Sequence, residues 1–193
     1  VNTPVADAPG AGKIYSVPLA VLRCPSDAFH ESGMSLTENG GADLWAVGNY
    51  AANYNVFGHP HGATAAERSE GRSRFEVACA DGMTNTVLFA ERYGTCGSDG
   101  VVSGGNTAGS LWCDSNNRWR PVFCVNEKDQ TPDAPGYTRC GMFQVAPNWL
   151  EDCDSSLAQT AHPGAMKVGL GDGSVRGVPG SLDPTTWNMP HRV

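Results

Sequence analysis

The residue best suited to acid–base chemistry in this chain is His162, because an imidazole changes its charge near neutral pH. With Asp81 or Asp172 and a nearby serine it has the residue types of a nucleophilic triad. No G-x-S-x-G nucleophile elbow accompanies these residues. We therefore expect His162 to bond a turn or a carboxylate as a structural group, and we expect the protein not to be an enzyme.

Metal binding is the second chemistry that the residue types allow. Carboxylate and amide oxygens of the kind that calcium prefers lie in glycine-rich turns at Asp81, Asn85, Asp99 and Asp172. Asp or Asn beside Gly is also common in tight turns, and the spacing of an EF-hand loop is absent. The tract His59-Pro60-His61 lacks further zinc ligands and is predicted to be a surface loop. We expect no required cofactor, with calcium at Asp81, Asn85 and Asp172 as the candidate metal site.

Tryptophan side chains are the candidates for binding a sugar, because flat rings with a polar edge suit stacking in water. Trp112 and Trp187 are expected in the core. Trp119 and Trp149 lie in polar loops. They are therefore the candidate residues for binding a polysaccharide or another solute, and core or interface packing is the other interpretation for both.

The charge and hydropathy of the chain exclude several classes of partner. The net charge is -7 at pH 7 and no two lysines or arginines are adjacent, so the positive surface that binds nucleic acid is missing. No apolar stretch approaches the roughly 18–20 residues that cross a bilayer, so we expect no membrane span in this chain. The 24 glycines, 13 prolines and 17% charged residues favour short strands and turns over long helices.

Seven cysteines without a C-x-x-C pair argue against zinc, iron–sulfur and redox dithiol sites and favour disulfides in an oxidising compartment. The disulfide candidates are Cys24, Cys79, Cys96, Cys113, Cys124, Cys140 and Cys153. An odd number leaves one thiol over, which could bridge to a neighbouring subunit. The sequence leaves open both the pairing and the identity of the unpaired cysteine.

The elements that must position these residues are short. Residues 1–13 are rich in Pro, Gly and Ala, so we predict an extended arm or linker, followed by a single globular domain over 14–193. Residues 14–24 suit an edge strand or extended segment, and residues 46–54 suit a strand or a short helix. The stretch from about 94 to 141 is dense in Gly, Asn, Asp and Cys, which predicts a loop-rich insertion stapled by disulfides.

Local signals are clearer elsewhere in the chain. The Thr-x-x-Glu spacing of a capping box predicts a short helix over about 64–70. Strands are expected over 75–79 and 84–91, the first residues of the latter being also assignable to a turn. Alternating apolar residues beside Asp172-Gly173 predict a β-hairpin over about 166–178, and a two-residue Asp-Gly loop suits a type I′ turn.

Four short motifs occur in order along the chain. They are Cys24-Pro25-Ser26-Asp27, Gly48-Asn49-Tyr50-Ala51, Asp81-Gly82-Met83-Thr84-Asn85-Thr86 followed by Glu91, and His162-Pro163-Gly164 with nine residues between His162 and Asp172-Gly173. Together they resemble the planctomycete-type family of pseudopilin-like proteins, which have a C-terminal H-x9-D-G motif and no assigned biochemical function. The resemblance extends from about Pro18 to Trp187.

The resemblance implies a bacterial, exported protein with the antiparallel sheet of a pilin or pseudopilin head domain. The implied fold is mainly β to α+β, with long disulfide-stapled loops and little helix. Family members begin with a hydrophobic helix that packs into a filament, and this chain starts downstream of it. We expect an extracellular or cell-surface structural subunit of a filament or of a type II secretion or type IV pilus-like assembly, which associates with itself or with other pilin-like subunits. A polysaccharide- or solute-binding module is the alternative.

Overall fold

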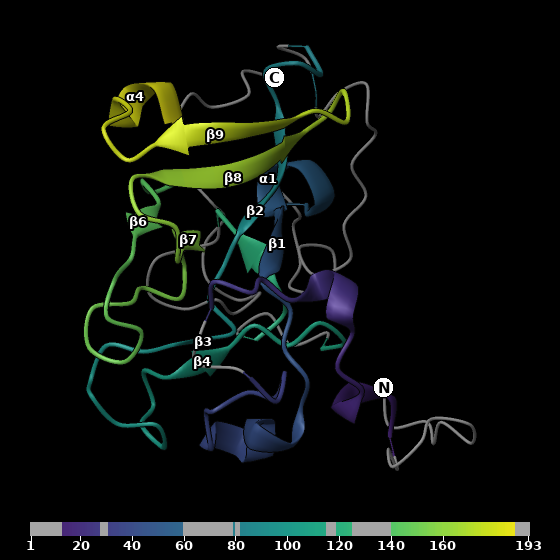
Figure 1. Cartoon of the computed structure of the whole chain (residues 1–193), viewed down its shortest axis with the longest axis vertical. Coiled ribbons are helices and arrows are strands. Elements are labelled where there is room, and N and C mark those ends of the chain that lie inside the picture. The colour runs from purple at the N-terminus through teal and green to yellow at the C-terminus, as the bar shows by residue number, and fades with distance from the viewer. Residues whose placement is uncertain are drawn as a thin grey trace.

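A five-stranded sheet forms the centre of the structure, a computed structural model that describes residues 13–27, 31–59, 79, 82–114, 119–124 and 140–187. The strand order is β5-β1-β2-β8-β9 (Figure 1). The strands are β1 (Tyr50–Asn53), β2 (Val87–Glu91), β5 (Val122–Phe123), β8 (Ala165–Leu170) and β9 (Val175–Pro179). Neighbours are antiparallel except β1 and β5, which are parallel. The fold is mainly β to α+β as predicted, but the sheet is mixed because β5 does not follow β1 through a hairpin.

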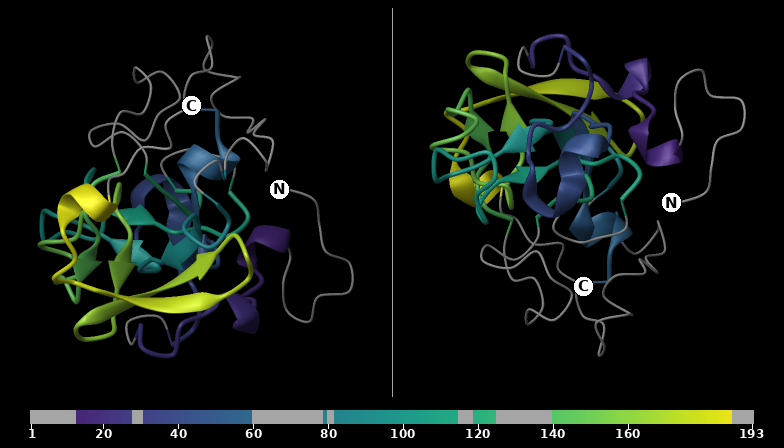
Figure 2. Two further views of the ribbon diagram at one scale, coloured as in Figure 1. Left: turned by 90° about the horizontal axis from the view of Figure 1, so that it is seen from above. Right: turned by 90° about the horizontal axis from the view of Figure 1, so that it is seen from below.

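Short elements make up the rest of the described residues. Two small sheets pair β3 (Thr95–Cys96) with β4 (Ala108–Gly109) and β6 (Gln144–Val145) with β7 (Gln159–Thr160). The helical segments are the 3-10 helices Ile14–Ser16, Ala20–Leu22 and Asn39–Leu44 and the helices α1 (Tyr54–Phe57) and α4 (Pro184–Trp187). None of the described helices has the length and apolar character needed to cross a membrane. The hairpin β8–β9 lies near one end of the long axis in Figure 1, and Figure 2 shows both strands curving along one side.

Side-chain alternation places one face of the large sheet in the core. Along β8, Met166, Val168 and Leu170 are buried, whereas Lys167 is exposed. The three apolar residues belong to one cluster with Ala51, Ala90, Phe123, Phe143, Ala158, Cys124 and Cys140. Trp187 of α4 packs against this cluster, with its ring centroid 5.0 Å from that of Phe143. A period of two is expected for a strand with one buried face.

The predicted hairpin over 166–178 is confirmed, but its turn differs from the prediction. The amide of Gly173 donates to Leu170 O (3.0 Å) and the amide of Leu170 donates to Ser174 O (2.9 Å), so the loop has three residues. Gly173 has φ +82°, and Asp172 does not share this positive φ. The type I′ prediction is therefore wrong, because that turn needs positive φ at both central residues. The loop instead ends on a single left-handed glycine.

Residues 14–24 form two 3-10 turns with extended residues between and after them, so of the two predicted alternatives the edge strand is wrong and the extended segment is present only in part. The amide of Val17 donates to Ile14 O (3.3 Å), and the amide of Arg23 donates to Ala20 O (3.2 Å). A proline lies between the two turns and has no amide to give to a strand ladder. Local turns therefore satisfy the hydrogen-bonding groups of the backbone on both sides of this proline, where the ladder of a β-strand would be interrupted.

The ambiguous stretch 46–54 contains both predicted alternatives, because β1 leads directly into α1. The Asn53 side chain ends the strand and caps the helix by accepting a hydrogen bond from the amide of Asn55 (3.0 Å). The strand predicted over 84–91 begins at Val87, so its first three residues belong to the turn.

Three predictions lie largely outside the described residues. They are the extended arm over 1–13, of which Lys13 alone is described, the helix over 64–70, and the strand over 75–79, of which Cys79 alone is described. These remain predictions from sequence.

Two disulfides staple the loop-rich part of the chain, Cys96–Cys153 and Cys124–Cys140. The expectation of a single leftover thiol is wrong, because Cys24, Cys79 and Cys113 are all unpaired. Cys79 is buried in a small cluster with Val56 and Leu88, and Cys24 lies beside a histidine described below, so each thiol has its own surroundings. Each bridge contributes about 2–4 kcal/mol by restricting the unfolded chain.

Candidate functional site

Cys24, Glu91 and His162, here called the trio, converge at the C-terminal end of β2, the central strand of the large sheet. Cys24 follows the second 3-10 turn, Glu91 ends β2, and His162 lies between β7 and β8. His162 Nε2 lies 3.0 Å from Glu91 Oε1 and 3.7 Å from Cys24 Sγ. One donor atom of each residue lies within 4.8 Å of the other two. A thiol, an imidazole and a carboxylate therefore face one small volume.

Glu91 is held in place by two hydrogen bonds to its other oxygen. Glu91 Oε2 accepts from Thr160 Oγ1 (2.6 Å) and from the amide of Lys167 (2.9 Å). Thr160 Oγ1 also accepts from the amide of His162 (3.0 Å). Glu91 is 4% exposed and Thr160 is fully buried, so this part of the trio is inside the protein. The arrangement leaves Oε1 directed at the histidine.

Cys24 is positioned through its backbone by a buried polar network. Its amide donates to Asn49 Oδ1 (2.9 Å), and Asn49 Nδ2 donates to Asp27 Oδ2 (2.6 Å). Asp27 Oδ2 also accepts from the amide of Gly94 (2.9 Å), and Asn49 Nδ2 donates to Arg92 O (3.1 Å). The Cys-Pro-Ser-Asp and Gly-Asn-Tyr-Ala motifs thus meet at the end of β2, a convergence that sequence order alone did not show.

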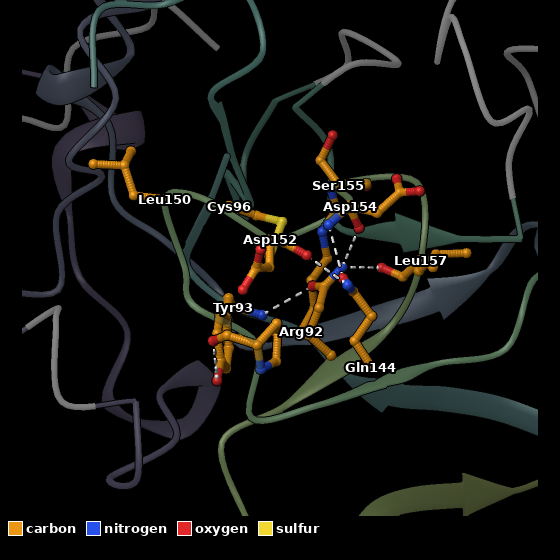
Figure 3. The surroundings of a disulfide bond; sticks show 12 residues. Arg92, Tyr93, Cys96, Gln144, Leu150, Asp152, Asp154, Ser155 and Leu157 are labelled. Atoms are coloured by element: carbon orange, nitrogen blue, oxygen red, sulfur yellow. Dashed lines mark hydrogen bonds between the residues drawn. A yellow bond between two sulfur atoms is a disulfide. The ribbon is translucent and has the colours of Figure 1, made fainter. Parts of the chain in front are cut away.

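Arg92, next to the trio in sequence, points to the other side of the sheet. Its guanidinium is buried and donates to Val122 O and to Ser155 O (2.7 Å). Burial lowers the pKa of Arg92 to about 10, and the nearby Asp154 opposes this shift. Figure 3 shows the side chain reaching toward Asp154 and Ser155 beside the Cys96 disulfide. Arg92 was not among the residues predicted from sequence, although an arginine directly after an apolar strand was its signal.

His162 does not meet Asp172, one of the two carboxylates proposed for a triad. Asp172 lies at the far end of β8, about 20 Å away for a six-residue strand. The carboxylate at His162 is that of Glu91, and the nucleophilic atom is the thiol of Cys24. Both approach the same ring nitrogen, whereas a triad uses one ring nitrogen for each partner. The predicted contact of His162 with a carboxylate is therefore present, and the Asp172 version of the triad is wrong. Asp81 lies outside the described residues.

The turn that follows Gly82 meets the Asp172-Gly173 loop at the hairpin end of the sheet. The amide of Asp172 donates to Met83 O (3.2 Å) and the amide of Gly171 donates to Thr86 O (3.0 Å). Hydrogen bonds from the side chain and backbone of Ser174 lower the pKa of Asp172. Asn85 lies in the adjoining turn, with its amide bonded to Gly82 O (3.0 Å). Two of the three candidate calcium residues thus lie on neighbouring turns, and the third, Asp81, is outside the described residues.

The candidate sugar-binding tryptophans are both half-buried. Trp119 packs against a cluster of Ala42, Val47 and Leu111, and Trp149 packs against the cluster that contains Tyr93. Packing therefore occupies part of each ring. Of the expected core tryptophans, Trp187 contacts the main core, and Trp112 is half-buried with its Nε1 donating to Val17 O (3.0 Å).

A more exposed aromatic patch lies on the outer face of the large sheet. Tyr50, Phe57 and Phe89 are 39%, 37% and 46% exposed, and the rings of Phe57 and Phe89 are 5.3 Å apart. Tyr50 pairs with Glu91 across β1 and β2, so the patch borders the trio. Burial raises the pKa of Tyr50, with further contributions from Cys24 and Glu91.

Comparison with known proteins identifies a family but no characterised relative. A family model described as a protein of unknown function, DUF1559 (SBP_bac_10), matches residues 2–185. No curated protein and no solved structure matches the chain. The description of the family names no assembly or activity, so the narrower resemblance to pseudopilins remains a prediction. Because the match covers all four motifs and most of the sequence, the chain belongs to the SBP_bac_10 (DUF1559) family of proteins of unknown function.

Proposed function

We propose that this protein is a pilin-like structural subunit that associates with further copies of itself outside the cell through the outer face of its sheet. The observation that supports this most strongly is an open apolar row across four strands. Val175, Gly169, Phe89 and Ala52 are paired in register from β9 to β1. Residues in register on adjacent strands share one face of a sheet.

The two large apolar residues of this row are accessible to a partner. Val175 is 72% exposed and Phe89 is 46% exposed, although both are large apolar residues. The aromatic patch formed by Tyr50, Phe57 and Phe89 extends the same surface. Contiguous exposed apolar surface on a folded protein is characteristic of association sites. A second copy of the chain, packed in a filament, is the proposed occupant.

The use of the motif side chains also supports a structural role. Asp27, Asn49 and Glu91 each accept a hydrogen bond from a backbone amide of a distant segment. Such bonds are expensive to leave unmade in a buried setting, so these residues fix the shape of the domain. The proposed role requires a rigid subunit and no chemical turnover.

The association proposal is tested by light scattering and electron microscopy of the purified chain across a wide range of concentrations. We expect oligomers or filaments that are lost in Phe89→Asp and Val175→Asp. The matched control is Leu44→Asp, because Leu44 is 60% exposed on the separate 3-10 helix Asn39–Leu44. Strictly monomeric wild-type particles at every concentration would contradict the proposal, as would equal loss of assembly in the control.

The proposed location outside the cytoplasm is supported by the two disulfides, which persist in oxidising compartments. Mass spectrometry of non-reduced native protein should find three free thiols, at Cys24, Cys79 and Cys113. Seven reduced thiols in native material would contradict an extracellular location.

Binding of a polysaccharide is the second candidate, and the exposed rings of Tyr50, Phe57 and Phe89 favour it. Flat aromatic rings on an open face suit stacking on sugars. A glycan array would show binding that Phe89→Ala removes and that the more buried Trp119 and Trp149 affect less. An array without any bound glycan would eliminate this candidate.

A further inference from the structure

The trio brings together three side chains whose chemistry is that of a zinc ligand set. Thiolate, imidazole nitrogen and carboxylate oxygen are the groups that bind Zn²⁺ in proteins. Cys24 and His162 are 138 residues apart in sequence, so no local turn brings them together. Their meeting depends on the complete fold of the sheet and its flanking loops. We propose that Cys24, Glu91 and His162 bind a zinc ion through Sγ, Oε1 and Nε2.

The separations between the donor atoms suit a tetrahedral ion. Zinc bonds of about 2.3 Å to sulfur and about 2.0–2.1 Å to nitrogen or oxygen place neighbouring ligand atoms about 3.3–3.5 Å apart. The observed separations are 3.7 Å from Cys24 Sγ to His162 Nε2 and 3.0 Å from that nitrogen to Glu91 Oε1. Movements of a few tenths of an ångström would complete both distances. His162 Nε2 lies close to both Glu91 Oε1 and Cys24 Sγ, so a single ion can contact all three donor atoms.

The residues around the trio already orient its ligands. Thr160 Oγ1 and the amide of Lys167 occupy Glu91 Oε2, which leaves Oε1 as the single carboxylate ligand. Asn49 holds the amide of Cys24 and so fixes the loop that carries the thiol. Outer hydrogen bonds of this kind preset the direction of metal ligands and typically change metal affinity about 10–100-fold when removed.

The site is open to solvent on the side of the histidine. The side chain of His162 is 36% exposed, whereas that of Glu91 is 5% exposed. An ion can therefore enter past the imidazole and bind against the buried carboxylate. Three protein ligands leave a fourth position for water or for a group from a partner, as in zinc sites that keep an open coordination position.

Cobalt(II) titration of the metal-free chain, with both disulfides intact, tests this proposal directly. A thiolate bound to Co²⁺ produces a sulfur-to-metal charge-transfer absorption, which Zn²⁺ abolishes on displacing the cobalt. We expect this absorption in the wild type, its loss in Cys24→Ser, and its retention in Cys113→Ser. Cys113 is a suitable control because it is also unpaired and similarly half-buried.

Two further variants test the other ligands and the outer shell. His162→Gln should weaken zinc binding by at least the roughly 10–100-fold expected for Thr160→Val, measured by competition with a chromogenic chelator. Circular dichroism and thermal unfolding of each metal-free variant report whether it folds. Folded Cys24→Ser with unchanged zinc affinity would overturn the proposal, and so would a wild type without the charge-transfer band. Either result leaves the association proposal untouched, because that proposal depends on Phe89 and Val175.

Discussion

Two regions of this molecule are ordered by different kinds of contact. The sheet region, made of β1, β2, β8 and β9, has strands of four to six residues, and side chains alternate between core and surface along β1 and β8. The stapled region, made of β3, β4, β6 and β7, has strands of two residues and includes the Cys96–Cys153 bridge. Such short strands supply few ladder bonds. In the stapled region, the disulfide and hydrogen bonds from side chains to the backbone hold the chain in place of ladder bonds.

The difference bears on where function can reside. Ladder bonds and a continuous core support the sheet region, where the trio lies at the end of β2 and the apolar row crosses the outer face. The stapled region supplies side chains that hold the trio in place, such as Thr160 at the end of β7, which donates a hydrogen bond to Glu91 Oε2. Breaking the contacts of each region in turn therefore distinguishes their contributions.

The largest effect is expected for Arg92→Ala, because Arg92 connects β5 of the large sheet to the stapled region. Its guanidinium bonds Val122 O of β5 and Ser155 O of the stapled region, and both bonds are charge-assisted. Their loss should lower the free energy of unfolding by about 3–5 kcal/mol, measured by urea denaturation. Arg176→Ala is the control, because Arg176 is exposed on β9 and a surface substitution usually changes the free energy of unfolding by less than about 0.5 kcal/mol. Equal effects would show that Arg92 does not connect β5 to the stapled region.

Removing one bridge with Cys96→Ser and Cys153→Ser should lower the free energy of unfolding by about 2–4 kcal/mol. The loss of hydrogen-exchange protection should concentrate in β3 and β4, while the β8–β9 hairpin keeps its protection. Cys113→Ser, which removes an unpaired thiol, should have little effect. A uniform loss of protection in both regions would contradict the division between them.

The same division explains which features the sequence could predict. The hairpin over 166–178 follows from the alternation of Met166, Val168 and Leu170, a signal contained in a few neighbouring residues. Its turn was mispredicted because the Asp-Gly pair by itself does not show whether the loop has two residues or three. The edge strand predicted over 14–24 was wrong because it depends on a distant partner. The apolar composition of this segment does not show whether a neighbouring strand is available to pair with it.

The trio was not predictable as a unit. Cys24 was a disulfide candidate, Glu91 a motif residue and His162 a structural histidine, and each assignment rested on local context. Their meeting requires knowledge of which loops flank which strand ends, which depends on packing across more than a hundred residues. The cysteine pairing was likewise open, because spacing alone permits many arrangements.

A smaller effect is expected for Gly173→Ala in the sheet region. Gly173 has φ +82°, a conformation that costs an alanine about 1–2 kcal/mol. No other atom lies within 4 Å of an added Cβ, so the cost is conformational only. Thermal unfolding should therefore show a modest decrease for Gly173→Ala and almost none for Gly105→Ala, where the surroundings are equally open and φ is not positive. Equal decreases would show that the left-handed turn does not matter.

The smallest effect concerns the pH dependence of the stapled region. Burial, aided by the charge of Asp27, raises the pKa of Tyr93 to about 12, against about 10 in the unfolded chain. Between pH 10 and 12 the unfolded state therefore binds fewer protons at this residue than the folded state, and its contribution to stability falls as the pH rises. Tyr93→Phe removes that dependence, and Arg92 titrates equally in both proteins. The difference in unfolding free energy between wild type and variant should change by about 1 kcal/mol over this window, less than the roughly 2.7 kcal/mol of a full pKa change from about 10 to about 12, because the Tyr93 hydroxyl is only partly buried. Parallel curves from pH 9 to 12 would show that the phenol of Tyr93 is not shielded from water by the packing around the Cys96–Cys153 bridge.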